Sequence, residues 1–123
     1  MLWATFKRFE DILVWQKARI VTKGVYEVTS DGPFSKDFGL RDQLRRASVS
    51  IMANIAEGCG RRSDKEFANF LNMARGSASE CQSHLYVALD LAYMANSDFD
   101  ELYQMFDECS RMVIGLIRHL RRS

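Results

Sequence analysis

The chain has 123 residues, of which 47% are hydrophobic and 27% are charged. That length suits one domain with a single core that needs no disulfide or metal for its stability. With 17 basic and 16 acidic residues the net charge is +1, and the sequence pI of 7.7 lies below the values above about 9 that are usual for nucleic-acid-binding domains. The composition argues against a strongly basic or acidic binding domain, although it allows a local charged patch.

Four segments have the periodicity of amphipathic helices, and the chain contains one proline. We predict helices over residues 11–29, 37–59, 64–95 and 98–121. The turn after the first helix is predicted from the Ser-Asp-Gly-Pro sequence at residues 30–33. Because four helices joined by short turns pack as neighbours, the sequence predicts an all-α, antiparallel, up-down-up-down four-helix bundle in a single domain, 1–123.

Glycines and caps locate some of the expected contacts and helix ends. Ser63 and Glu66 have the spacing of a capping box at the start of the third helix. The second helix is expected to end at Gly58 or Gly60, where glycine can adopt a left-handed conformation. Gly76 lies in mid-helix, where glycine costs about 1 kcal/mol relative to alanine, so we expect a close contact there.

The second helix is apolar on two sides. One stripe belongs to the core and consists of Leu40, Leu44, Ala47, Ile51 and Ile55. The opposite face consists of Val49, Met52, Ala53, Ala56 and Cys59. Because a helix with two apolar sides is normally buried on both, we expect other copies of the chain to cover this face. Burying about 400 Å² would give about 10 kcal/mol against an association cost of about 4–15 kcal/mol, so other helices must contribute.

Between these two faces runs a line of polar residues. Its members are Gln43, Arg46, Ser50, Asn54 and Glu57. A buried arginine needs a carboxylate, and we expect Glu80 of the third helix to pair with Arg46. The line is interpreted as a structural polar network between helices. The alternative is a small-ligand or anion pocket lined by Arg46, Asn54 and Glu57.

Basic residues gather in the middle and at the end of the chain. The candidate nucleic-acid-binding residues are Arg45, Arg61, Arg62, Arg118, Arg121 and Arg122. The negative end of a helix dipole accounts for bases at the end of the last helix. Symmetric copies of these arginines in an oligomer could still form a positive surface for phosphates, so RNA or DNA is predicted as a possible partner.

The sequence offers little for catalysis. His84 and His119 have no metal-ligand or nucleophile-base spacing to other residues, and we expect no metal, no cofactor and no enzyme activity. Cys59, Cys81 and Cys109 are odd in number and widely spaced, which is typical of free thiols in a reducing compartment. With neither a signal-peptide pattern nor a membrane-length apolar run, we expect a cytoplasmic protein.

Several segments together resemble one known family. They are residues 9–11, 14–19, 39–40, 43–47, 49–51, 53–58, 60–61, 70–71 and 76–77, with Ser63, Glu66 and Ala74. The Ala-Asn-Ile-Ala-Glu-Gly sequence at 53–58 is the most specific of them. Through these residues the chain resembles the bacterial 23S rRNA intervening-sequence protein family, and the match extends over nearly the whole chain.

The resemblance implies a four-helix bundle that assembles as a ring-like homopentamer with no known catalytic activity. We expect the chain to act as a scaffold or nucleic-acid-associated binding module. The family is also similar to the accessory variability determinant of diversity-generating retroelements, which binds nucleic acid and a reverse transcriptase. Met52 stands where the family usually has proline, so the expected helix kink is weaker or absent. Cys59 replaces a common aromatic residue, which affects the expected packing of the turn at residues 58–60.

Overall fold

The structure, a computed structural model, describes residues 8–122, so residues 1–7 and 123 of the predicted domain lie outside the described residues. The described part is helical and contains no strand. Its elements are, in chain order, the 3-10 helix η2 (Phe9–Asp11) and the α-helices α1 (Leu13–Val28), α2 (Gly32–Lys36), α3 (Phe38–Cys59), α4 (Asp64–Asp90) and α5 (Asn96–Arg121). The all-helical class predicted from the sequence is confirmed.

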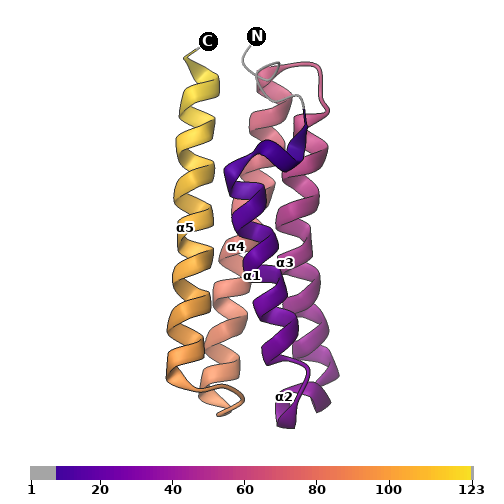
Figure 1. Cartoon of the computed structure of the whole chain (residues 1–123), viewed down its shortest axis with the longest axis vertical. Coiled ribbons are helices and arrows are strands. Elements are labelled where there is room, and N and C mark those ends of the chain that lie inside the picture. Colours follow the sequence, from indigo (N-terminus) through magenta and orange to yellow (C-terminus); the bar gives the residue numbers. More distant parts are fainter. Residues whose placement is uncertain (1–7, 123) are drawn as a thin grey trace.

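The four long helices α1, α3, α4 and α5 lie side by side, and the connections between successive ones alternate between the two ends of the molecule (Figure 1). Helix α1 packs against α3 and α5, and α4 also packs against α3 and α5. Helices α1 and α4 therefore occupy opposite corners. The bundle has four sides, which we name α1/α3, α3/α4, α4/α5 and α5/α1 after the helices that form them.

The core lies along the central axis, where the predicted apolar seams meet. Helix α3 contributes Leu44, Ala47, Ile51 and Ile55, which are all fully buried. The other long helices bury their own seams against this stripe, and the short α2 adds the ring of Phe34. Fully burying one such aliphatic or aromatic side chain contributes about 1.5–3 kcal/mol, so the seams are the main stabilising feature.

Side chains cap two of the long helices. The Asp37 carboxylate accepts the backbone N–H of Leu40 at 3.1 Å at the start of α3. The Ser63 hydroxyl accepts the N–H of Glu66 at 3.1 Å, as in the predicted capping box. The Glu66 carboxylate reaches back to the N–H of Arg62 rather than to that of Ser63. Each cap satisfies a helix N–H that would otherwise lack a partner.

Helix α4 ends at Asp90, although the periodic apolar pattern predicted a helix to Ala95. Ala92 has a positive φ of 57°, and its N–H donates to the carbonyl of Leu89. The next N–H, from Tyr93, donates to the carbonyl of Ala88 at 2.9 Å. This pair of bonds is a Schellman motif, which usually has glycine at the left-handed position. Alanine at this position does not indicate a helix end in the sequence, so the predicted helix extended beyond Asp90.

The predicted turn after α1 contains the short helix α2. Gly32 has a φ of 64°, and proline follows it in the first turn, where its missing N–H costs nothing. The Phe34 ring stacks on Tyr93 with centroids 5.3 Å apart. The Tyr93 hydroxyl donates to Asp37 at 2.9 Å. These two contacts join α2 and the start of α3 to the α4–α5 connection.

Helix α3 runs without a break through Met52 and ends at Cys59. The predicted left-handed cap is wrong, because Gly60 has a right-handed φ of −82°. Glycine is required at Gly58 for a different reason. A Cβ there would lie 2.7 Å from the Cβ of Phe70 and 3.0 Å from the Phe67 ring. The absence of a side chain lets α3 and α4 approach closely.

Replacing Gly58 by alanine is expected to lower the free energy of unfolding by about 1–3 kcal/mol, because the new methyl group overpacks the α3–α4 contact. Urea denaturation followed by circular dichroism measures this change. Gly60→Ala is the matched control, since its Cβ would meet its nearest atom at an ordinary 3.6 Å. Equal stabilities of the two variants would contradict the close approach.

A second prediction concerns Tyr93, whose hydrogen bond to Asp37 raises the pKa of the phenol above its ordinary 10.0. A raised pKa means that this stabilisation is present below pH 10 and is lost as the pH rises through the folded-state pKa. Urea denaturation at a series of pH values from about 9 to about 11 is expected to show a smaller loss of stability in Tyr93→Phe than in the unmodified chain. Tyr103, whose pKa is raised by Tyr86, and the buried thiols of Cys81 and Cys109, whose pKa values are also raised, contribute to the loss of stability that remains. Identical slopes would contradict the assignment.

Candidate functional site

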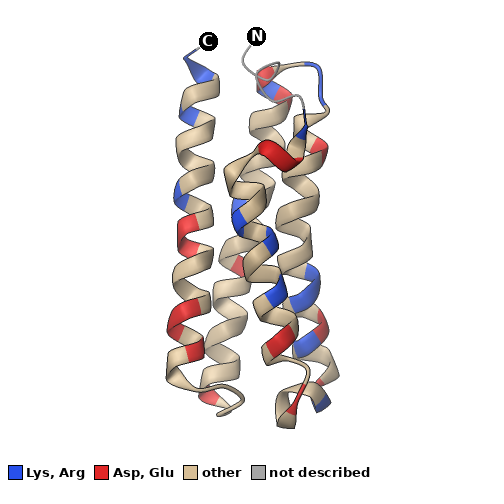
Figure 2. Ribbon diagram, viewed as in Figure 1, with Lys and Arg blue, Asp and Glu red and all other residues tan. Residues whose placement is uncertain are grey.

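Most of the predicted basic residues share one end of the bundle. Arg118, Arg121 and Arg122 are exposed at the end of α5. Arg61 and Arg62 lie in the connection between α3 and α4. The end of α5 and this connection lie at the same end of the molecule (Figure 1), and both contain basic residues in Figure 2. The fold thus brings together two clusters that are far apart in the sequence.

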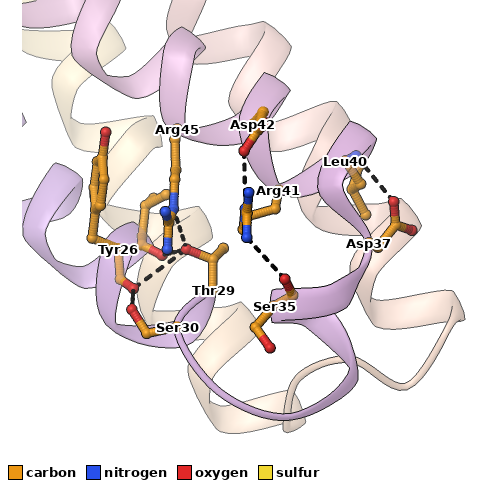
Figure 3. Close-up of polar contacts among 10 residues, drawn as sticks. Tyr26, Thr29, Ser30, Ser35, Asp37, Leu40, Arg41, Asp42 and Arg45 are labelled. Atoms are coloured by element: carbon orange, nitrogen blue, oxygen red, sulfur yellow. Dashed lines mark hydrogen bonds and ion pairs between the residues drawn. The ribbon is translucent and has the colours of Figure 1, made fainter.

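Arg45 is separate from this group and lies on the α1/α3 side. Its Nε donates to the hydroxyl of Thr29 at 2.8 Å, and its guanidinium lies 4.5 Å from the centroid of the Tyr26 ring (Figure 3). Nearby, Arg41 donates to the carbonyl of Ser35 at 2.9 Å (Figure 3). Arg45 therefore links the end of α1 to α3, and one copy of the chain cannot present it on the same side as α5.

A groove between α4 and α5 accompanies the basic end of α5. It consists of two hollows of 400 Å³ and 250 Å³ that share Asn72 and Arg121 in their linings. Lys65 and Asn69 line the larger one, and Arg75 and Arg118 line the smaller one. Sequence analysis identified Arg118 and Arg121 as candidates and missed the residues from α4. The missed signal was the helical spacing of Lys65, Asn69, Asn72 and Arg75, which places them along one line of α4.

The basic side chains that line the groove differ in their partners from Arg61 of the neighbouring connection. Arg61 pairs with Glu57 at 2.7 Å and lies over the ring of Phe70. In the described part of the chain, Lys65, Arg75, Arg118 and Arg121 make no ion pair. The acidic residue in the lining is Asp64. The groove therefore has a local excess of positive charge in a chain whose net charge is only +1.

The predicted polar network forms separate groups along the α3/α4 side. Arg46 donates to Glu80 at 2.6 Å, and Glu80 also contacts His84 at 3.1 Å. The Arg46 side chain is 62% exposed, so this surface ion pair contributes only about 0–1 kcal/mol and is not the buried pair expected. A second group forms where Asn54 donates to Ser50. The hydroxyl of Ser77 joins that group from α4, with its oxygen 3.2 Å from the Ser50 hydroxyl.

This arrangement does not favour the alternative of a small-ligand pocket. Glu57 pairs with Arg61, the Asn54 amide donates to the carbonyl of Ser50, and Arg46 pairs with Glu80. Gln43 is exposed at the edge of the same line. The grooves described in this structure are lined by other residues. The network is best described as a set of surface contacts that connect α3 to α4 and to the following turn.

The expected oligomer face of α3 is smaller than the sequence suggested. Val49 and Ala53 are exposed, and Ala56 is half-buried. Met52 and Cys59 are also half-buried, but they pack against the chain's own core. Helical periodicity did not reveal these contacts within the chain. They arise because α1 and η2 cover one flank of α3 and α4 covers another. Exposed apolar residues on other helices, described below, were not identified from the sequence.

The cysteines and histidines form no recognisable reactive centre. Burial raises the pKa of the Cys109 thiol to about 11 and that of Cys81 well above its usual range, so both thiols stay protonated at neutral pH. Burial also raises the pKa of Cys59. Within residues 8–122, no group of three or more His, Cys, Asp or Glu residues could hold a metal ion.

None of the helices between residues 8 and 122 combines the length and the apolar character needed to cross a bilayer.

A family model described as 23S rRNA-intervening sequence protein matches residues 10–115. The chain belongs to this family. It is also similar to the crystal structure of a protein with unknown function from the S23 ribosomal protein family of Bacteroides thetaiotaomicron. The TM-score is 0.78 at 24% identity, with 85% of this chain and 97% of that chain covered, so the likeness shows a common fold. Comparison with curated proteins finds no match. The similarity to the accessory variability determinant stays a prediction.

Proposed function

We propose that this member of the family is a non-catalytic scaffold: an antiparallel four-helix bundle that assembles head to tail into a ring and associates with nucleic acid. The observation that supports it best is that aliphatic side chains of α1 and α4 are exposed on two opposite sides of the bundle. The family description names 23S rRNA, which supports an RNA-linked role in the cytoplasm. Five copies is the number implied by the sequence resemblance.

The first apolar side is α5/α1. Leu13 and Ile20 of α1 have 68% and 59% of their surface exposed. Between the start of α1 and α5 lies a groove of 300 Å³ that Leu13, Met112 and Leu116 line. Exposed apolar residues that gather around an apolar groove are typical of a protein–protein contact. This side is therefore suited to receive another copy of the chain.

The second apolar side is α3/α4. On α4 it exposes Met73 and Val87, at 56% and 44%. Gly76 lies between the two α4 residues in sequence, and a Cβ there would meet no atom within 4 Å. The close contact expected at Gly76 is therefore not made within one chain. We assign it to the neighbouring copy, whose helix could approach closely at a glycine.

The positions of these two sides determine the kind of assembly proposed. The α5/α1 and α3/α4 sides are opposite, because α1 and α4 occupy opposite corners. A contact between two different patches is heterologous, and it continues from copy to copy until the ring closes. Such a ring leaves the α1/α3 and α4/α5 sides uncovered on every copy. The basic α4/α5 groove would then be repeated around the ring.

The test uses one variant for each side. Ile20→Glu places a charge on the α5/α1 side and Met73→Glu places one on the α3/α4 side, and both residues are exposed enough in the single chain to leave the fold intact. Each variant alone is expected to be monomeric. An equimolar mixture is expected to form a heterodimer, because one intact side of each kind remains. Size-exclusion chromatography with light scattering measures these masses.

Each variant mixed with itself is the matched control and should give monomers only. Circular dichroism verifies that both variants keep the helical content of the unmodified chain. Two results would contradict the head-to-tail assembly: variants that still form the full oligomer, or a mixture that contains no heterodimer.

A further inference from the structure

The α4/α5 groove has a regular arrangement of polar groups. Lys65, Asn69, Asn72 and Arg75 follow one another on α4 at spacings of four, three and three. At 1.5 Å per residue this line is about 15 Å long. The cations stand at its two ends and the amides between them, while Arg118 and Arg121 line the groove from α5.

The electrostatics of the two helices differ, and the difference points to a bound anion. The bases at the end of α5 lie near the negative end of its helix dipole, which is sufficient to explain them. Lys65 lies in the first turn of α4, where the dipole is positive and disfavours a cation. Arg75 lies near the middle of α4, where the dipole has little effect. The helix dipole therefore does not account for the α4 cations, whereas an anion bound in the groove would.

The shape of the groove indicates the class of anion. A line of about 15 Å with a cation at each end is too long for a single phosphate. Single strands usually bind where aromatic side chains stack on their bases, and none of the described residues that line the groove is aromatic. Double-helical RNA is recognised through phosphates and ribose 2′-hydroxyls across its shallow minor groove. Asparagine amides between two cations match that pattern.

We propose that the α4/α5 groove binds double-helical RNA independently of its sequence. The cationic side chains contact phosphates of the two strands, and Asn69 and Asn72 hydrogen-bond to ribose 2′-hydroxyls. This inference rests on the proposed association with nucleic acid and names its substrate class and its site. In a ring, every copy contributes one such groove, so the binding of a long RNA duplex gains from several weak contacts at once.

The first experiment compares charge reversals of equal size in the full chain. Arg75→Glu with Arg118→Glu alters the groove, and Lys23→Glu with Lys36→Glu is the control at exposed positions on other helices. Fluorescence anisotropy with a labelled RNA hairpin at low salt measures binding. The groove variant is expected to bind about tenfold more weakly or worse, and the control to change by less than about threefold. The groove variant should also show a shallower salt dependence, by about one unit of slope for each phosphate that it no longer neutralises.

The second experiment tests the contacts to ribose. The unmodified chain is expected to bind the RNA hairpin more tightly than a DNA hairpin of the same sequence or an RNA of the same length that forms no base pairs. Asn69→Ala with Asn72→Ala is expected to reduce the preference for RNA over DNA while leaving the salt dependence unchanged, because the phosphate contacts remain. A purely structural role of the asparagines would not change that preference.

The outcomes separate this inference from the proposed function. If groove and control variants bind the RNA hairpin equally, nucleic-acid association stands but the groove is not its site. If the unmodified chain binds DNA or single strands as well as duplex RNA, the substrate class is wrong. If it binds no nucleic acid at low salt, both the inference and the nucleic-acid part of the proposed function are overturned.

Discussion

The close approach of α3 and α4 is the contact on which the rest of the structure depends. It is possible because Gly58 has no side chain where the ring of Phe67 and the Cβ of Phe70 pass. Further along the same side, the hydroxyls of Ser50 and Ser77 lie 3.2 Å apart and continue the contact between the helices. Because this pair of helices is held in register, the outer face of α4 and its groove with α5 have defined positions. The interior is mainly apolar, with Thr22, Thr29 and Ser48 as buried polar residues, and the charged groups lie on the sides of the bundle.

The proposed assembly and the proposed nucleic-acid binding involve different sides of the bundle. Opposite sides carry exposed aliphatic residues such as Ile20 and Met73, and a third carries the basic groove together with the exposed ring of Tyr86. The side that remains, α1/α3, holds Arg45 in contacts with Tyr26 and Thr29, so its charge serves the chain's own packing. In the proposed arrangement assembly and nucleic-acid binding use different residues, and the two surfaces adjoin on α4, where Gly76 of the assembly contact directly follows Arg75 of the groove.

Much of the fold could be predicted from the sequence, because helical seams repeat at a period set by backbone geometry. Local exceptions were missed where residues departed from their usual roles: Ala92 takes a left-handed conformation that favours glycine, and Gly58 permits close packing where a cap was expected. The candidate site was predicted only in part. Arg121 was found from the run of bases at the chain end. Lys65 was missed because its relation to Arg121 depends on how α4 packs against α5, which no local pattern contains.

The central claim is that the apolar sides of this bundle require other copies of the same chain. Native mass spectrometry of the unmodified protein at micromolar concentration tests it most directly, because it counts subunits without depending on shape. The account predicts one closed species containing several copies of the 14.2 kDa chain, and five is the number that the family resemblance implies. A spectrum that contains only the 14.2 kDa monomer throughout the micromolar range would contradict it.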